Sequence, residues 1–453
     1  MVKKNRKMRS EEIIHDIFTA ALEAVDPYLI VKTHADRVRR DFIKKNFNKL
    51  LVIGFGKASF QMARAVEEIF GAGLIEEGVV VTKYGHCKDL RSVVSGNQSA
   101  KLKKTRVYEA GHPIPDENGI KATEEIIGLL KNTDENTTVL CLISGGGSAL
   151  NVSPYEGISL NEKQLITDLL LRAGADITEL NAVRKHISKV KGGRIAEIAR
   201  PAEIISLMVS DVIGDKIDVI ASGPTAPDTS TFQDALDVIN KYNLSGKTPE
   251  SVMDVLNKGR DGLIPETPKK DNRVFEKVEN IIIGNNRKAI DAAENKALSL
   301  GLEAEVISTD IRGEAAEAGK WLAGKAIEIK RAGAQGHSNA RCLVSGGETT
   351  VTVKGKGKGG RNTELALSFA LEIEGIEGIT LLSAGTDGND GPTDAAGAVV
   401  DGSTIIKARN LGLDPVECLN NNDSYSFFKQ TGSLLITGPT GTNVMDIQIV
   451  LVK

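Results

Sequence analysis

The sequence predicts an α/β protein with two domains and mainly parallel sheets. The first observation is length, because the chain has 453 residues and a single core rarely grows beyond about 250–300 residues. The second is a recurring unit, in which a short β-branched apolar run is followed by a loop of small residues and then by a helical pattern. That order is typical of parallel sheets whose strands are buried on both faces.

Six apolar runs end in small or polar residues, and these ends are the most informative part of the sequence. Because ligands of parallel sheets gather beyond the carboxyl ends of the strands, we look for chemistry in the loops that follow these runs. The runs cover residues 50–53, 139–143, 205–209, 281–283, 343–344 and 381–382.

A change of composition predicts where the domains separate. Between Asn243 and Phe275 the chain becomes rich in Lys, Gly, Asp and Pro. We therefore predict an N-terminal domain over residues 1–245, a linker region over 246–277 and a smaller C-terminal α/β domain over 278–453.

Two further elements are predicted near the ends of the chain. Apolar residues recur at helical spacing between residues 13 and 25, and this helix is expected to pack on the first sheet. Residues 434–437 and 445–452 are expected to form an antiparallel hairpin at a sheet edge.

Composition excludes several classes of protein. Lys and Arg total 57 against 60 Asp and Glu, so nothing indicates a nucleic-acid partner. No apolar run reaches the roughly 18 residues of a membrane span, and the amino-terminal segment lacks the apolar core of a signal peptide. The four cysteines have no paired spacing and are expected to be reduced thiols. We therefore expect a cytoplasmic protein without a membrane partner.

A glycine-rich loop follows the second apolar run. It reads Ser144-Gly145-Gly146-Gly147-Ser148, and consecutive glycines allow backbone N–H groups to surround phosphate oxygens. The spacing is neither that of a P-loop nor that of the dinucleotide fingerprint. Taken alone, the loop is either a phosphate site or a tight turn between a strand and a helix.

Two cations lie where helices are predicted to begin. Lys57 follows Gly54-Phe55-Gly56 and is expected in the first turn of a helix over residues 58–70. Helix amino termini favour anions, so a lysine there suggests a bound phosphoryl or carboxylate group, with a solvated surface lysine as the alternative. Arg361 follows the basic segment 354–360, whose lysines suggest either a mobile flap over an anion or, as we favour, the solvated tip of a hairpin.

Acidic residues follow three of the predicted strands. Carboxylates at strand ends suit Mg²⁺, which usually takes only one or two of them together with phosphate oxygens and water. We expect two or three of the seven to serve, and the rest to cap helices and form turns. His112 and His186 lack metal or triad spacing and are expected to be structural. The seven acidic residues are Asp211, Asp215, Asp218, Glu348, Asp387, Asp390 and Asp394.

The loops also carry a family resemblance. The chain resembles the glycerate 2-kinase family of bacteria and archaea, whose C-terminal half is called the MOFRL domain. The matching segments lie in family order between about residue 50 and residue 390, so the probability of agreement by chance is very small. They include Gly54-Phe55-Gly56-Lys57-Ala58, Gly111-His112-Pro113, Ile143 to Leu150, Lys191-Gly192-Gly193-Arg194, Ser210 to Asp215, Ala221 to Thr225, Ser345 to Thr349, Gly359-Gly360-Arg361-Asn362 and Gly385 to Gly388.

The resemblance implies a function. It implies a Rossmann-like N-terminal domain, a MOFRL-type C-terminal domain, and an active site in the cleft between them. The reaction would be phosphorylation of D-glycerate at its 2-hydroxyl by ATP and Mg²⁺, giving 2-phosphoglycerate and ADP. Lys57 and Arg361 match the proposed active-site cations of the family, and both would bind the substrate.

The remaining site residues are assigned roles on that basis. Residues 144–148 would cradle the phosphates of ATP, and Asn285 would contact the nucleotide. Asp211 would bind Mg²⁺ or accept the hydroxyl proton, with Asp387 and Glu348 as alternative metal ligands. A homodimer is the working expectation. Two other functions stay open, namely an NAD(P)-dependent hydroxy-acid dehydrogenase and a non-catalytic regulator that binds a sugar phosphate.

Overall fold

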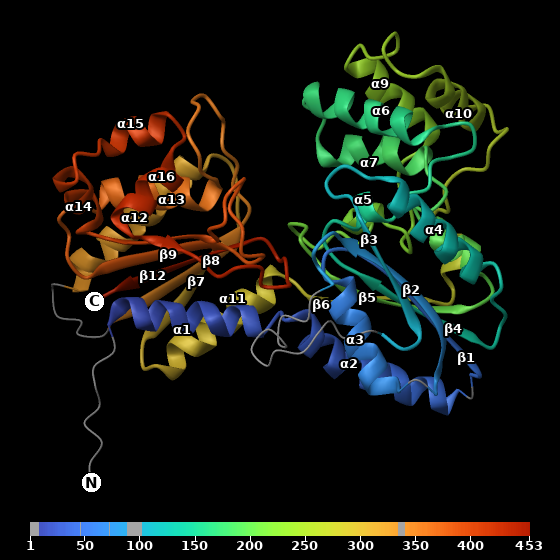
Figure 1. The fold of residues 1–453 in the computed structure, drawn as a ribbon, viewed down its shortest axis with the longest axis horizontal. Coiled ribbons are helices and arrows are strands. Elements are labelled where there is room, and N and C mark those ends of the chain that lie inside the picture. Colours follow the sequence, from blue (N-terminus) through green and yellow to red (C-terminus); the bar gives the residue numbers. More distant parts are fainter. Residues whose placement is uncertain (1–8, 46, 72, 88–101, 334–339) are drawn as a thin grey trace. The chain divides into compact units, whose positions relative to one another are not determined.

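The computed structural model describes residues 9–45, 47–71, 73–87, 102–333 and 340–453. The chain divides into two compact units, each with a six-stranded sheet covered by helices, so the predicted α/β class is confirmed. One unit comprises Pro27–Ile283, and the other comprises Met1–Asp26 together with Gly284–Lys453. Figure 1 shows both units with their elements labelled.

The first sheet, in the unit Pro27–Ile283, has the strand order β3-β2-β1-β4-β5-β6. The neighbours from β3 to β5 pair in parallel. This is the order of a Rossmann-type sheet, in which the chain reverses its direction of winding between β1 and β4 and leaves a crevice at their carboxyl ends. The strands are β1 Lys49–Phe55, β2 Ile75–Lys83, β3 Thr105–Ala110, β4 Thr137–Ile143, β5 Glu203–Val209 and β6 Val278–Gly284.

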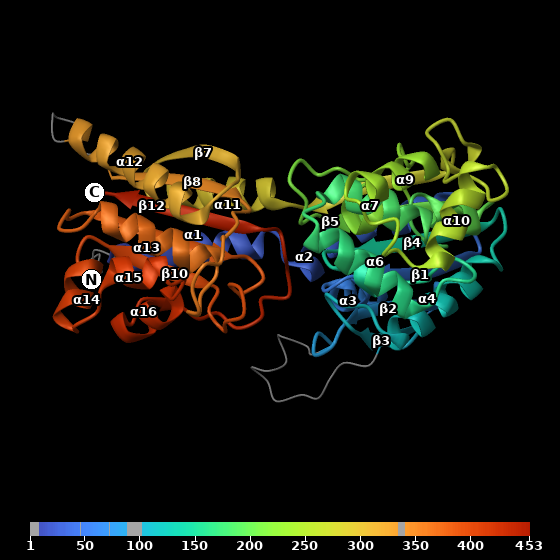
Figure 2. The same cartoon turned by 90° about the horizontal axis from the view of Figure 1, so that it is seen from above.

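Some helices of this unit cover the sheet, and others form a separate helical layer. The pair α3 and α4 packs on the strands, while α6, α7, α9 and α10 share an apolar cluster of their own and gather beside α5 (Figures 1 and 2). The helices are α2 Pro27–Lys44, α3 Ser59–Phe70, α4 Glu117–Leu130, α5 Gly147–Leu150, α6 Leu160–Arg172, α7 Ile177–His186, α8 Arg194–Ala199, α9 Phe232–Lys241 and α10 Glu250–Arg260.

The second sheet is mixed and has the order β11-β10-β9-β12-β8-β7. Only β7 and β8 pair in parallel among the described pairs, and the other neighbours are antiparallel. The strands are β7 Glu303–Ile311, β8 Arg341–Gly347, β9 Ile379–Gly385, β10 Gly397–Asp401, β11 Leu434–Leu435 and β12 Asp446–Val452.

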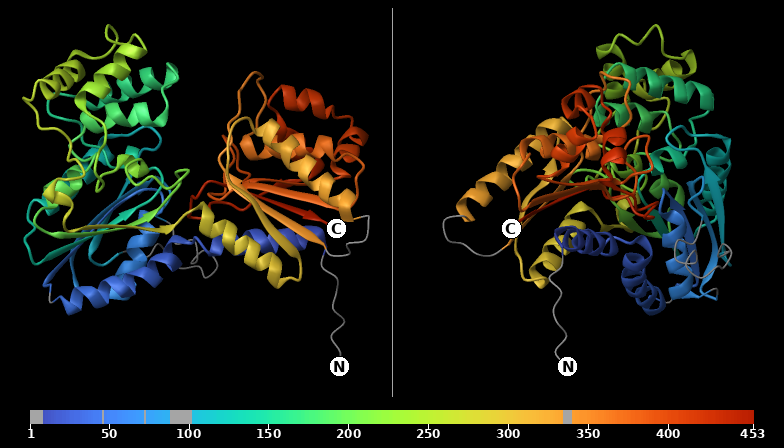
Figure 3. Two further views of the ribbon diagram at one scale, coloured as in Figure 1. Left: turned by 180° about the vertical axis from the view of Figure 1, so that it is seen from behind. Right: turned by 60° about the vertical axis from the view of Figure 1, so that its left-hand side comes forward.

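Helices cover both faces of the second sheet. Figures 1 and 3 show α1 and α11 on one face, and α12 and α13 on the other. The helices of this unit are α1 Ser10–Glu23, α11 Asn286–Ser299, α12 Ala315–Gly333, α13 Arg361–Glu372, α14 Thr404–Asn410, α15 Pro415–Asn420 and α16 Ser424–Thr431.

Two sequence-based predictions about the chain ends are wrong. The strand β12 does not form an edge hairpin, because it lies between β8 and β9 and is buried along its whole length. Its run of apolar residues satisfies a strand with neighbours on both sides. The helix α1 forms as predicted but packs on α11, β12 and β9 of the second sheet instead of on the first sheet.

The domain boundaries also differ from those predicted from composition. The strand β6 completes the first sheet, so residues 278–283 belong with the N-terminal half. Within the predicted linker, α10 buries Val252, Val255 and Leu256 in the helical layer. A segment rich in Pro and Gly therefore forms part of a folded unit.

No helix of the described residues is both long and apolar enough to cross a bilayer.

Candidate functional site

Lys57 lies at the point where the first sheet reverses its winding. Its backbone N–H donates to the carbonyl of Gly145 at 2.9 Å, and the next residue, Ala58, donates to Oγ of Ser144 at 3.0 Å. The loops after β1 and β4 are therefore tied together at the carboxyl ends of adjacent strands. Lys57 precedes α3, whose N-cap is Ala58, instead of lying in the first helical turn as predicted.

Two glycines allow these loops to approach closely. Gly56 has φ +134° and a Cβ there would lie 2.2 Å from Oγ of Ser144. Gly146 has φ +81° and a Cβ there would lie 2.8 Å from Cδ2 of His112 and 3.4 Å from Cγ of Lys57. Both positions require glycine because of their backbone conformation and because no space is left for a side chain. The loop thus brings backbone, imidazole and lysine together.

A cavity of about 510 Å³ opens beside this loop, and it lies entirely in the unit Pro27–Ile283. Gly146, Ser148 and His112 line one side of it. Burial, and then the charge of Lys57, lower the pKa of His112 to about 4, so its imidazole is neutral at neutral pH. The sequence predicted a structural histidine, whereas the structure places His112 at the cavity wall. His186 is structural as predicted, since Nδ1 contacts the carbonyl of Ala182 and Nε2 contacts Glu266.

A hydrogen-bonded chain supports the far end of the glycine loop. Oγ of Ser148 lies 2.8 Å from Oγ of Ser222, which in turn donates to Oδ1 of Asn181 at 2.8 Å. Ala221 and Ser222 both have positive φ, at 51° and 63°. Such conformations are costly for residues with a Cβ and are often found at functional sites. The strained turn presents the Ser222 hydroxyl to Ser148.

The predicted nucleotide-binding residues differ in their access to the cavity. Ser144 is buried, and its hydroxyl is used by Ala58. Of the five residues of the loop, only Gly146 and Ser148 line the cavity. Asn285 lies in the other unit, where its side chain accepts from the N–H of Lys288 at 3.0 Å and caps α11.

Arg361 is the first residue of α13, in the unit that contains the second sheet. Asp390 caps this helix by accepting from the N–H groups of Asn362 at 2.9 Å and Thr363 at 2.8 Å. The guanidinium of Arg361 contacts Glu348 at 3.0 Å and also the buried carboxylate of Asp446. Because β12 runs antiparallel to β8 and β9, its first residue, Asp446, lies beside their last residues.

The three predicted metal ligands are divided between the two units. Asp211 follows β5 in the unit of the first sheet, whereas Glu348 and Asp387 belong to the other unit. Within the described ranges, no group of three or more His, Cys, Asp or Glu side chains could hold a metal ion. Glu348 is paired with Arg361, and Oδ1 of Asp387 accepts from the N–H of Asn389 at 3.0 Å.

The Lys-Gly segment before Arg361 is neither a hairpin tip nor an unsupported flap. Asn422 Oδ1 accepts from the N–H groups of Lys354 and Gly355 at 2.8 and 2.9 Å, and Asp423 Oδ1 accepts from that of Lys358 at 2.9 Å. The glycines face this turn, where a Cβ on Gly355 would lie 2.2 Å from a carbonyl oxygen. The lysines are exposed on the opposite side. Close packing therefore explains the alternation of Lys and Gly.

Sequence reasoning assigned no role to two cations that line the cavity, Lys163 on α6 and Arg184 on α7, although Arg184 lies in a segment, Arg184-Lys185-His186, that resembles the family. One signal could have found Lys163. It shares the buried face of its helix with Ile166 and Leu170, at helical spacing. A lysine within an apolar stripe is unusual, because lysine is rarely buried without a partner.

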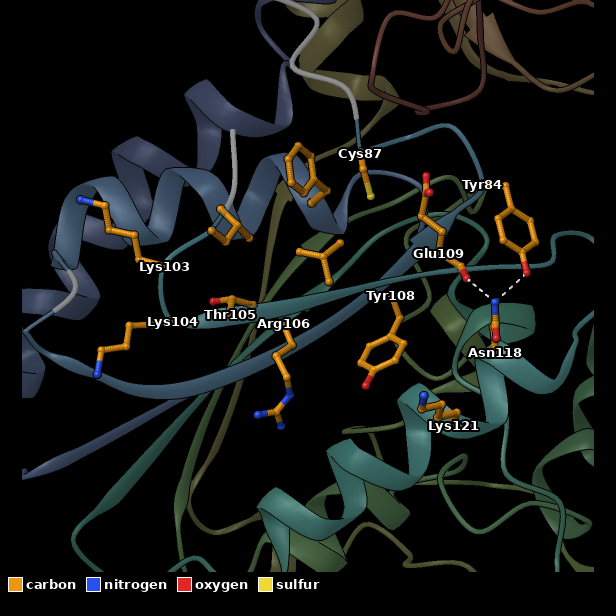
Figure 4. A pocket seen from close by; sticks show the side chains of 13 residues that line it. Tyr84, Cys87, Lys103, Lys104, Thr105, Arg106, Tyr108, Glu109, Asn118 and Lys121 are labelled. Carbon is orange, nitrogen blue, oxygen red and sulfur yellow. Dashed lines mark hydrogen bonds between the residues drawn. The ribbon is translucent and has the colours of Figure 1, made fainter. Parts of the chain in front are cut away.

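A larger cavity of about 970 Å³ runs along the edge strand β3 (Figure 4). Its most prominent cation, Arg106, is already paired with Glu77 and Glu125. Asn118 donates to Tyr84 and to the carbonyl of Glu109 across one end of the cavity (Figure 4). This cavity lies along the strand and not at the carboxyl ends where the glycine loop and Lys57 meet, so we do not assign the chemistry to it.

Comparison with known proteins identifies the family of the chain. Residues 13–257 match the model of a domain of unknown function, DUF4147, and residues 341–446 match the MOFRL family. A D-glycerate 2-kinase of Thermotoga maritima is 47% identical over 96% of this chain and 97% of its own length. A glycerate 2-kinase of Pyrococcus horikoshii is 45% identical over 95% of both chains. The chain belongs to the glycerate 2-kinase family.

Solved structures show the same relationship. The crystal structure of the Thermotoga maritima glycerate kinase has a TM-score of 0.86 to this protein at 46% identity, and covers 98% of this chain and 99% of its own. The chain is a phosphotransferase that acts on an alcohol group. Within the same range of similarity, a protein of Agrobacterium vitis that is 38% identical over 98% of this chain is provisionally named a hydroxypyruvate reductase.

Proposed function

We propose that this protein transfers the terminal phosphoryl group of ATP to the 2-hydroxyl of D-glycerate, giving 2-phosphoglycerate and ADP. The observation that supports this most is the joint of the β1 and β4 loops. There Lys57 adjoins a glycine-rich loop at the switch point of a Rossmann-type sheet, in a chain that is 47% identical to a D-glycerate 2-kinase. Loops of this kind bind phosphates through backbone N–H groups.

Phosphoryl transfer requires mainly positioning and charge neutralisation from the protein. Lys57 and Arg361 supply the positive charge. One binds the carboxylate of glycerate, and the other stabilises the phosphoryl group during its transfer. Arg361 is already oriented by Asp446 and Glu348, so its donors need little reorganisation when charge develops. Asp211 accepts the proton of the 2-hydroxyl or serves as a metal ligand.

The residues present fit a nucleotide-bound Mg²⁺. A magnesium ion that accompanies phosphates needs only one or two protein carboxylates, so the lack of a three-ligand cluster among the described residues is compatible with it. We prefer Asp211 among the predicted ligands, because it follows β5 in the same unit as Lys57 and the glycine loop, whereas Glu348 is held by Arg361. When bound, the ion neutralises charge on the phosphate oxygens.

One experiment tests the proposal directly. The purified protein is incubated with D-glycerate, ATP and Mg²⁺, and the phosphorylated product is identified by NMR. Formation of 2-phosphoglycerate is the expected result. Formation of 3-phosphoglycerate would keep the kinase and overturn the position of transfer. If no ADP formed with or without Mg²⁺, the proposed kinase activity would be wrong.

Two other functions can be distinguished in the same preparation. A hydroxy-acid dehydrogenase would form the reduced nicotinamide cofactor from glycerate and the oxidised cofactor, and a hydroxypyruvate reductase would consume the reduced cofactor; absorbance reports both changes. The glycine loop Ser144-Gly145-Gly146-Gly147-Ser148 does not have the dinucleotide fingerprint, which disfavours that reading. A non-catalytic regulator would bind a sugar phosphate without forming ADP.

A further inference from the structure

The cavity beside the glycine loop contains a buried lysine. Lys163 is 4% exposed and lines the cavity. Within the described residues, its ammonium forms no ion pair, and the charge that acts on it is another cation, Arg184. Burial, and then the charge of Arg184, lower the pKa of Lys163 to about 8. Burying an uncompensated charge costs folding free energy, so the arrangement makes sense when an anion occupies the cavity.

Neighbouring cations differ in how they are neutralised. On α7, Lys185 is paired with the buried Asp228 at 3.0 Å, whereas the adjacent Arg184 lines the cavity and contacts no carboxylate within the described ranges. Behind the glycine loop, the ammonium of Lys191 is fully buried and donates to the carbonyls of Ser148 and Asn151 at 2.7 and 3.1 Å. The positive charge on this side of the cavity is therefore not cancelled by the protein.

The cavity offers few negative charges of its own. Among the residues lining it, only Asp168 is acidic, and its carboxylate is exposed and pairs with Arg172 at 2.8 Å. At the loop, the N–H groups of Gly145 and Gly146 form no hydrogen bond within the part of the chain that the structure describes. Free N–H groups next to two unpaired cations form a site for several phosphate oxygens.

The cavity also has apolar lining residues, and its size suits a large ligand. They include Pro113, Ile114 and Leu171, which we call the apolar wall. A cavity of about 510 Å³ falls in the range that holds ligands the size of a nucleotide, whereas glycerate has only a few heavy atoms. Lys163 and Leu171 lie eight residues apart on α6, so about 12 Å of helix separates the ammonium's residue from the apolar one. This separation suits a molecule with a polyphosphate at one end and an aromatic base at the other.

We propose that this cavity is the nucleoside triphosphate site, in which Lys163 and Arg184 bind phosphate oxygens and Ile114 and Leu171 contact the base. The inference rests on the proposed function, because it assigns a place to the phosphoryl donor of that reaction. It adds residues from α6 and α7 to the glycine loop, and it reserves Lys57 for the reacting end of the nucleotide.

The test uses the full-length protein and two probes, ADP and inorganic pyrophosphate, titrated by calorimetry. Lys163→Met should raise the Kd of both probes at least tenfold, because both carry the phosphates. The melting temperature of the ligand-free variant should not fall, because methionine is similar in length to lysine and the substitution removes a buried, unpaired charge. Lys189→Met is the control, since Lys189 is partly exposed and pairs only loosely with Glu124 and Glu156.

A second pair of variants tests the apolar wall. Leu171→Ala should weaken the binding of ADP severalfold and leave pyrophosphate binding unchanged, because only the base contacts that wall. Leu165→Ala is the matched control, since Leu165 is an exposed leucine of the same helix that does not line the cavity. Equal losses for both probes in Leu171→Ala would contradict the assignment of the base.

The outcomes separate this inference from the proposed function. If the wild-type protein phosphorylates glycerate and Lys163→Met binds both probes normally, the site is wrong and the kinase stands. If Lys163→Met loses D-glycerate binding and keeps ADP binding, the cavity holds the acceptor and the inference is overturned. If the wild-type protein binds neither probe and forms no ADP, the proposed function fails together with the site.

Discussion

The guanidinium of Arg361 is held at both prongs by the carboxylate of Asp446, with Nε–Oδ2 at 2.6 Å and Nη2–Oδ1 at 2.9 Å. Asp446 is 1% exposed, and Glu348 contacts the remaining nitrogen, Nη1, at 3.0 Å. A bidentate pair fixes the plane of the guanidinium as well as its position. Arg361 is therefore oriented before any ligand arrives, and Asp446 is its positioning residue.

Substitution of Asp446 should destabilise the protein. Asp446→Asn keeps the shape of the side chain and removes a charge-assisted pair, so the free energy of unfolding should fall by about 1.5–3 kcal/mol. Urea unfolding measures the change. Glu303→Gln is the control, because the Glu303–Arg341 pair is exposed and should contribute less than about 1 kcal/mol. Equal effects of the two variants would mean that the Arg361–Asp446 pair contributes no more than a surface pair.

Activity should depend on bidentate donation by the guanidinium of Arg361 and on the charge of Lys57. Arg361→Lys keeps a cation opposite Asp446 but loses bidentate donation, and Lys57→Ala removes a charge, so each should lower kcat by about 10² or more. Arg361→Ala is a poorer probe, because it leaves the buried carboxylate of Asp446 unpaired. Steady-state kinetics measure the effect, with the exposed Lys131→Ala as control. Near-normal turnover in either variant would remove that residue from the site.

Space at Gly146 should matter more than its backbone conformation. Gly146→Ala and Gly157→Ala both place a Cβ on a residue with positive φ, at 81° and 88°, so both should cost about 1 kcal/mol of stability. Only at Gly146 does the Cβ meet another residue, 2.8 Å from His112, whereas nothing lies within 4 Å at Gly157. Gly146→Ala should therefore lose at least tenfold in kcat/KM while Gly157→Ala keeps its activity. Similar activities in the two would argue against a role for the close approach.

Much of the first site was predictable because parallel strands place their carboxyl ends at one edge. Lys57 and the loop 144–148 follow β1 and β4, and they meet at the switch point as strand-end reasoning requires. Sequence order alone could not show that the hydroxyl of Ser144 accepts a hydrogen bond from Ala58, or that only Gly146 and Ser148 of the loop reach the cavity. Such details depend on which way each loop turns after its strand.

The residues that were missed come from elements whose neighbours the sequence does not reveal. Asp446 begins a strand instead of ending one, and it joins Arg361 only because β12 inserts antiparallel between β8 and β9. Lys163 lies on α6, and its exposure depends on how that helix packs in the helical layer. The position of α1 was wrong for the same reason, since an apolar stripe states that a helix packs but not on which sheet.

The support of the Lys-Gly segment by Asn422 can be tested with a protease. Asn422→Gly keeps a residue that tolerates the φ of +53° and removes the oxygen that accepts from Lys354 and Gly355. Losing the two hydrogen bonds to the segment, of about 1 kcal/mol each, should speed tryptic cleavage at Lys354, Lys356 or Lys358 at least about tenfold. The variant also removes a third hydrogen bond, from Nδ2 of Asn422 to Glu364, which does not involve the segment. Mass spectrometry identifies the cuts. Asn243→Gly, also at φ +53°, should leave them unchanged. Rapid cleavage of the wild type would support the alternative interpretation, in which the segment is a mobile flap.

The buried lysine of the cavity should make stability depend on pH in a known direction. The pKa of Lys163 is lowered to about 8 in the folded protein, while the unfolded chain titrates near its usual 10.5. Between these values the unfolded state binds more protons, so the free energy of unfolding should rise with pH across this window, by about 2–4 kcal/mol from this residue. At the cavity, the pKa of His112 is about 4 and Arg184 stays charged, so neither titrates there. Burial also lowers the pKa of Lys191 behind the glycine loop, and this residue is common to the wild type and to the Lys163→Met variant.

Comparison of the wild type with Lys163→Met isolates this contribution from that of other lysines. Urea unfolding of the ligand-free proteins at about pH 7 and about pH 10 should show a larger rise for the wild type than for the variant. ADP affinity should change in the opposite direction, because phosphates favour the charged ammonium, and should fall as pH rises above about 8 in the wild type alone. Parallel pH profiles for the two proteins would show that Lys163 carries no buried charge, and the cationic end of the cavity would then reduce to Arg184.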